Sequence, residues 1–177
     1  MASTSSEQET PEERFTRLLR VYGTSLQRLT VSYEGDPNDR EDLFQEICLA
    51  IWKALKGFRD ECSERTFLFR IGHNRGLTHR WRRKPTHTDM DAAASVPDPG
   101  EPPDEAVQRT QRHHRLMSAV RQLPEPQHQI VVLSLEGLSH REIAEIIGIT
   151  ENNVGVRLTR ARQTLRTLLD TQEGKQP

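Results

Sequence analysis

The stretch Ser139-His-Arg-Glu-Ile-Ala-Glu-Ile-Ile-Gly-Ile-Thr150, followed by Glu151-Asn-Asn-Val-Gly-Val-Arg-Leu-Thr-Arg-Ala-Arg162, predicts two short helices joined by a tight turn. Ala144, Gly148 and Val154 fall where a helix-turn-helix needs a small residue at the crossing, a turn glycine and a buried anchor. A helix presented in this way fits the major groove of DNA. The stretch therefore predicts sequence-specific DNA binding.

The ends and faces of these two helices support the same interpretation. Ser139 and Glu142 have the spacing of a capping box, and Thr150 is a suitable N-cap for the second helix. The second helix is expected to bury an apolar face and to present polar side chains on the other: Asn152, Asn153, Arg157, Arg160 and Arg162. Asn pairs with adenine and Arg with guanine or phosphate. A solvated basic face of a structural helix is the alternative.

The rest of the chain predicts an all-α protein of two small helical domains. Only 33% of the residues are apolar and 29% are charged, so any core is small. Apolar residues recur at helical spacing over about 12–33, 39–56 and 64–83, and again near 106–122 and 125–136. Ile130-Val-Val-Leu133 is β-prone by composition, but we expect a helix there because its helical neighbours need an apolar partner.

Between the two domains, residues 85–105 are expected to form a flexible linker. The segment is rich in proline, and residues 84–107 carry six acidic side chains and one basic one. Residues 1–11 and 172–177 are expected to be disordered. Cys48 and Cys62 predict neither a disulfide framework nor a metal site, and the chain has no run of ~20 apolar residues. We therefore expect a cytoplasmic protein.

Three motifs in order resemble bacterial sigma factors. Asp42-Leu43-Phe44-Gln45-Glu46, followed by Ile51-Trp52-Lys53-Ala54, resembles the helix that binds polymerase. Arg65-Thr66-Phe67-Leu68-Phe69-Arg70-Ile71-Gly72-His73-Asn74-Arg75 resembles the promoter-melting segment, and Leu123-Pro124-Glu125 with the helix-turn-helix resembles the C-terminal domain. Their order and spacing resemble the extracytoplasmic-function subgroup.

The resemblance implies a division of labour along the chain. Residues 12–84 would be sigma region 2 and residues 106–171 sigma region 4. Region 2 would bind core RNA polymerase, at the clamp helices of β′ and at β, through Asp42, Leu43, Gln45 and Glu46. Acidic residues in a first helical turn also favour the helix dipole by themselves.

The resemblance also implies two promoter-contacting surfaces. The −10 element would be captured as single strand by the loop 57–63 and the third helix, through Phe58, Arg70, Asn74, Arg75, Arg80, Arg82 and Arg83. The −35 element would be read by Asn152, Asn153, Arg157, Arg160 and Arg162. Gly155 departs from the family pattern, because several members have a basic residue there.

The function expected from these residues is that of an alternative sigma factor, with promoter DNA, core polymerase and an anti-sigma factor as partners. No catalytic residue, cofactor, metal or small-molecule substrate is expected. A stand-alone helix-turn-helix regulator is the alternative. A metal-dependent nuclease is disfavoured because the histidines lack acidic partners at ligand spacing.

Overall fold

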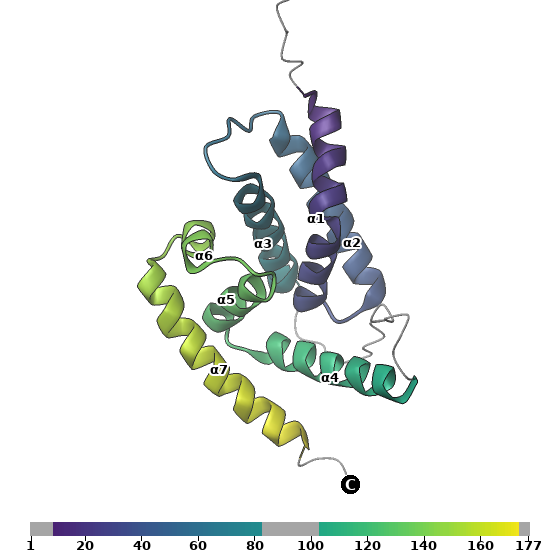
Figure 1. Ribbon diagram of the computed structural model, residues 1–177, viewed down its shortest axis with the longest axis vertical. Helices are drawn as coiled ribbons and strands as arrows, with labels where there is room; N and C mark the ends of the chain where they lie inside the picture. Colours follow the sequence, from purple (N-terminus) through teal and green to yellow (C-terminus); the bar gives the residue numbers. More distant parts are fainter. Residues whose placement is uncertain (1–8, 83–102, 174–177) are drawn as a thin grey trace, which may run out of the picture.

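The computed structural model describes residues 9–82 and 103–173, and all regular structure within these ranges is α-helical. Figure 1 shows the helices in order. They are α1 (Pro11–Tyr33), α2 (Pro37–Leu55), α3 (Glu64–Arg82), α4 (Pro103–Gln122), α5 (Glu125–Leu135), α6 (His140–Ile147) and α7 (Glu151–Glu173). The all-α prediction is confirmed.

The first two helices begin where local capping places them. Thr10 and Glu13 form a capping box at the start of α1, which therefore begins at Pro11, one residue earlier than expected. The Asp36 side chain accepts hydrogen bonds from the amides of Asn38 and Asp39. Pro37 is consequently the first residue of α2, because proline has no amide hydrogen to leave unsatisfied there.

Helices α1, α2 and α3 pack on one another as an N-terminal half. Its core consists of side chains with exposed fractions of 1% or less: Leu18, Leu26, Leu29, Leu43, Ile47, Ile51, Leu68 and Phe69. Gly72 of α3 lies directly against α1, since a β-carbon there would come within 2.7 Å of the Leu29 side chain. The small residue lets the two helices approach closely.

Helices α4 to α7 form the C-terminal half around α5. The β-prone run at 130–133 is helical, as expected, and Ile130, Val132 and Leu133 are completely buried. Because α5 contacts α1, α3, α4, α6 and α7, it has neighbours around its circumference, which a helix with apolar residues on several sides requires. Helix α4 starts at Pro103, earlier than the expected 106, so residues 103–105 are helical.

The helix-turn-helix has the predicted local structure. The Ser139 amide donates to Glu142 Oε2 (2.8 Å), and the Glu142 amide donates to Ser139 Oγ (3.2 Å). Gly148 ends α6 with φ of +79°, a conformation that favours glycine. Thr150 Oγ1 accepts a hydrogen bond from the Asn153 amide at 3.3 Å, so Thr150 caps α7.

The two halves also pack against each other, which the sequence did not predict. Helix α3 contacts α5 and α6, and α1 contacts α4 and α5. In Figure 1, α3 lies between α1 on one side and α5 and α6 on the other, while α7 occupies the opposite edge. The predicted linker lies outside the described residues except for 103–105.

Candidate polymerase and nucleic-acid interfaces

Helix α7 presents the predicted −35 surface. Val154, Leu158 and Ala161 are at most 5% exposed and fix one face of the helix to the C-terminal half. On the other side four predicted side chains are exposed and Arg157 is half-buried; the exposed ones are Asn152, Asn153, Arg160 and Arg162. The structure therefore brings all five predicted −35 residues to the outer part of one helix.

The structure adds an observation on each of two further residues of this surface, Val156 and Gly155. Val156 is 43% exposed between the predicted polar residues, and an apolar side chain there suits the methyl group of thymine. A β-carbon at Gly155 would lie 3.8 Å from the His140 ring, an ordinary contact. The glycine is therefore not required by packing of α7 against α6.

Helix α2 carries the predicted polymerase-binding residues on two different faces. Asp42, Gln45 and Glu46 are exposed and lie on the outer face. Leu43 is completely buried, so it packs α2 into the core and does not contribute to the outer surface. Leu49 is 52% exposed one turn beyond Gln45, and it adds apolar surface beside the acidic side chains, which the motif did not identify.

The loop 57–63 is held to α1 by Arg14. The Phe58 ring stacks on Phe67 with 4.1 Å between centroids, and the Arg14 guanidinium lies 4.8 Å from the Phe58 ring centre. Arg14 also pairs with Asp60 and donates to Glu64 Oε1 at 2.9 Å. Asp60 has a φ of +56°, which is uncommon for a residue with a side chain. The loop therefore has a defined shape, and Phe58 is half-buried within it.

The predicted −10 residues of α3 fall into two groups. Asn74, Arg75 and Arg82 are exposed, and Arg83 lies outside the described residues. Arg70 and Arg80 contact the C-terminal half. Arg70 pairs with Glu145 at 3.1 Å, and Arg80 Nη2 donates to the carbonyl oxygens of Arg121 (3.0 Å) and Leu123 (3.3 Å). Part of the predicted −10 surface is thus occupied by the protein itself.

Two buried histidines lie on either side of Tyr33 where the halves meet. The Tyr33 hydroxyl and His73 Nδ1 are 2.6 Å apart, and the Tyr33 and His128 rings meet edge to face at 5.0 Å. His128 Nε2 lies 2.9 Å from the Ser32 carbonyl oxygen, which only accepts, so Nε2 carries the proton. Burial lowers the pKa of His73 to about 4 and that of His128 to about 3. Both rings are therefore neutral at pH 7.

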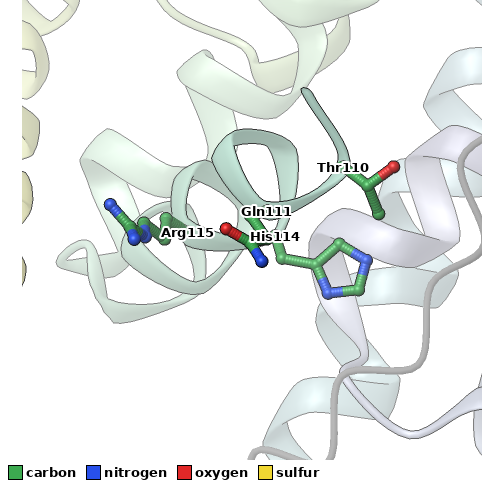
Figure 2. A pocket seen from close by; sticks show the side chains of 4 residues that line it. All are labelled: Thr110, Gln111, His114 and Arg115. Atoms are coloured by element: carbon green, nitrogen blue, oxygen red, sulfur yellow. The ribbon is translucent and has the colours of Figure 1, made fainter. Parts of the chain in front are cut away.

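A cavity of about 350 Å³ is lined by Thr110, Gln111, His114 and Arg115, all on α4. Figure 2 shows these side chains pointing in different directions from one helix. None of the predicted site residues lines it. Within residues 9–82 and 103–173, no cluster of three or more histidine, cysteine or acidic side chains could hold a metal ion. In the same ranges, no helix is long and apolar enough to cross a membrane.

Models of known protein families match both halves of the chain. Residues 18–86 match the model of sigma-70 region 2, and residues 113–165 match that of sigma-70 region 4. The first match covers the candidate polymerase and −10 surfaces, and the second covers α5, α6 and most of α7. Because both halves match, a stand-alone helix-turn-helix regulator is not favoured.

Named relatives resemble the chain over nearly its whole length. RNA polymerase sigma factor NccH of Alcaligenes xylosoxydans xylosoxydans is 30% identical over 90% of this chain and 88% of its own. The ECF RNA polymerase sigma-E factor of Haemophilus influenzae is 27% identical over 89% of this chain and 88% of its own.

Solved structures share the fold. The structure of CnrH in complex with the cytosolic domain of CnrY has a TM-score of 0.67 at 26% identity, covering 90% of each chain. The sigma factor RpoE of Bartonella quintana, in complex with the anti-sigma factor NepR, has a TM-score of 0.68 at 21% identity, covering 89% of this chain and 98% of its own. With two family models matched and NccH similar end to end, the chain belongs to the sigma-70 family of RNA polymerase sigma factors, in its extracytoplasmic-function group.

Proposed function

We propose that this sigma factor binds core RNA polymerase through the outer face of α2, reads the −35 element with α7 and captures the −10 element with α3 and the loop 57–63. The three surfaces lie on different helices of one chain. A molecule bound to polymerase through α2 can therefore contact the two promoter elements through α7 and α3. No bond chemistry is assigned to the protein itself.

One observation carries this proposal: the exposed side of α7. Val154, Leu158 and Ala161 are buried, so the orientation of the helix is fixed and its Asn and Arg side chains point outward. Amide and guanidinium groups are the side chains that make bidentate contacts with adenine and guanine in the major groove. A helix that served only to pack would not need this set on its outer face.

The α2 face supports the polymerase contact. Asp42 and Glu46 are exposed carboxylates that suit a basic partner surface, and exposed Leu49 supplies apolar area beside them. Leu43 stabilises the same helix from within the core. We assign the contact to the clamp helices of β′, with further contacts to β.

Anti-sigma control is also part of the proposal. CnrH was solved in complex with the cytosolic domain of CnrY, and RpoE of Bartonella quintana was solved in complex with the anti-sigma factor NepR. By this likeness we propose that an anti-sigma protein binds the present chain and withholds it from polymerase. We expect the tagged chain to co-purify with a protein that blocks transcription when it is added to the assay. If no such protein co-purifies from either induced or uninduced cells, the proposed anti-sigma control is contradicted.

The test is transcription in vitro from a library of randomised promoters, using core polymerase with and without the protein. We expect start sites that depend on the protein and share two conserved elements. Sequencing of the transcribed templates reports both elements. Tight dimeric binding of the isolated chain to duplex DNA, without polymerase-dependent start sites, would contradict the proposal.

A further inference from the structure

Arg14 of α1 lies against the loop 57–63, although the family resemblance placed no promoter contact on α1. The Phe58 ring stacks on the Phe67 ring with 26° between their planes, so Phe67 covers one face of Phe58. The Arg14 guanidinium, 4.8 Å from the centre of the Phe58 ring, therefore covers the other face. A base that enters this part of the surface finds no free face of Phe58 on which to stack.

One amino group of Arg14 is available to an external acceptor. Arg14 Nε donates to Glu64 Oε1 at 2.9 Å, and Nη2 donates to Asp60 Oδ1. Among the described residues, none places an acceptor within hydrogen-bonding distance of Arg14 Nη1, and the side chain is 21% exposed. Because a guanidinium has five N–H groups, the two at Nη1 remain for a ligand.

Arg17, three residues further along α1, differs in this respect. Its Nε and Nη2 donate to Glu9 at 2.7 and 2.9 Å, and its Nη1 and Nη2 donate to Glu64 at 3.0 and 2.8 Å. All three nitrogens of Arg17 are thus used on carboxylates of the chain. Glu64 accepts from Arg14 as well, so it holds the two guanidinium groups together at the start of α3.

The charges around Arg14 favour a base over a phosphate as its external partner. Arg14 and Arg17 are paired with three carboxylates, those of Glu9, Asp60 and Glu64. The hydrogen bond from Arg17 is the main cause that lowers the pKa of Glu64, so this carboxyl is charged at pH 7. The cluster therefore has no positive charge to spare for a phosphate. Its guanidinium still donates directional hydrogen bonds, which suit the acceptor atoms on the edge of an unstacked base.

The place of Arg14 also fits the rest of the proposed −10 surface. Phe67 and Asn74 are seven residues apart on α3, so they lie on the same side of the helix, about 10 Å apart along its axis. Asn74 is exposed at one end of this side. Arg14 lies at the other end, where it covers Phe58 beside Phe67. A strand that follows this side of α3 therefore reaches both hydrogen-bonding side chains.

We propose that Arg14 is a specificity-determining residue of the −10 surface, which donates from Nη1 to an acceptor atom on the edge of an unstacked base. Phe58 is then a positioning residue: it holds the guanidinium in place and does not itself stack on the base. This inference rests on the proposed capture of the −10 element by α3 and the loop 57–63. It predicts that the preference for one base of this element depends on the Arg14 guanidinium.

The test uses the full chain bound to core polymerase, with three variants. Arg14→Lys keeps a cation for Asp60 and Glu64 but lacks the planar fork, since all N–H groups of an ammonium leave one atom. Asp60→Asn cuts the ion pair between Arg14 and the loop but keeps the guanidinium, and asparagine tolerates the positive φ of this position. Arg17→Lys is the matched control, because the nitrogens of Arg17 are used within the chain.

Binding of single strands is measured by fluorescence anisotropy. The probes are the non-template −10 strand of a promoter selected in the transcription assay and strands in which each position carries the other bases in turn. We expect the parent chain to show, at one position, about a five- to twentyfold preference that Arg14→Lys loses. Asp60→Asn and Arg17→Lys should keep this preference. The preference is a ratio between strands of equal charge, so general attraction to DNA cancels.

Amide hydrogen exchange of the loop 57–63 separates direct reading of a base from an effect on loop shape. Arg14→Lys should leave the exchange close to that of the parent chain, whereas Asp60→Asn should make it faster. Equal loss of the preference in these two variants would overturn the inference, and so would a loss of affinity in Arg14→Lys that is the same on every strand. If the parent chain on polymerase shows no preference among the strands, the proposed function is refuted instead.

Discussion

The Tyr33 ring of α1 lies directly against the backbone of Gly76 in α3, where a β-carbon would come within 2.5 Å of the ring. This close approach places the Tyr33 hydroxyl 2.6 Å from His73 and its ring edge on His128 of the other half. One aromatic side chain thus packs α1 on α3 and also contributes to the interface between the halves. Each of these contacts depends on the missing side chain at Gly76.

Gly76→Ala is expected to destabilise the protein by about 1–3 kcal/mol, because the tyrosine ring is rigid and its neighbours fill the space around it. The control is Gly23→Ala in α1, where a β-carbon meets nothing within 4 Å. That change should stabilise the helix by up to ~1 kcal/mol. Urea unfolding of both variants measures the difference. Equal stabilities would contradict the tight contact.

Acid should destabilise the folded chain through His73 and His128. Burial lowers their folded pKa values to about 4 and about 3, below the unfolded value, so the unfolded chain binds protons first as the pH falls. Each histidine should therefore cost about 2 kcal/mol of stability between pH 7.5 and pH 5. Nearby charged groups shift the two pKa values in opposite directions: Glu125 raises the pKa of His73, whereas Arg80 lowers the pKa of His128.

Unfolding of the parent chain at the two pH values measures this loss. His128→Gln removes one titrating group, so we expect its stability to fall by about 2 kcal/mol less over the same interval. His140→Gln is the control, because His140 is exposed. A pH dependence unchanged by His128→Gln would show that His128 is not held neutral by the fold.

Arg14→Ala is expected to release the loop 57–63, because this guanidinium pairs with Asp60 and Glu64 and covers Phe58. Amide hydrogen exchange within the loop should become faster, and binding of the −10 strand should weaken while −35 binding remains. Arg20→Ala, at an exposed position of the same helix, is the control. Unchanged exchange in the Arg14 variant would argue against its role in shaping the loop.

Arg160→Ala is expected to weaken binding to the selected −35 duplex by ~1–3 kcal/mol if this arginine reads a base. The polymerase-bound protein should then discriminate less between the selected and scrambled duplexes. Arg166→Ala, further along α7, should affect both duplexes alike or neither. An equal loss on both duplexes for Arg160→Ala would identify Arg160 as a phosphate contact.

Glu46→Lys should reduce binding to core polymerase without unfolding the protein, since Glu46 is exposed on α2. A charge of the opposite sign on a docking face repels the basic surface that a carboxylate attracts. Glu12→Lys on α1 is the matched control. Pull-down of core enzyme, with circular dichroism to check folding, measures the effect, and normal recovery of polymerase would count against the docking role.

Local sequence features predicted the helices, and they predicted the ends of α6 and the start of α7 from capping chemistry. Ser139 with Glu142 and Gly148 with its positive φ are short-range features, because capping and turn chemistry involve residues only a few positions apart. The polar residues that face outward on α7 were also predicted from helical periodicity. Leu43 also recurs at helical spacing with Ile47 and Ile51, and all three are completely buried. The motif assigned Leu43 to polymerase binding, whereas helical periodicity indicated its place in the core.

The way in which the two halves meet could be seen only in three dimensions. Arg65 and Glu142, or His128 and Ser32, are far apart in the chain, and no local pattern links such pairs. Their contact depends on the shapes of two finished cores and on glycines such as Gly76 that admit a neighbour. Sequence periodicity reports which face of a helix is apolar, whereas the partner of that face is fixed by packing in three dimensions.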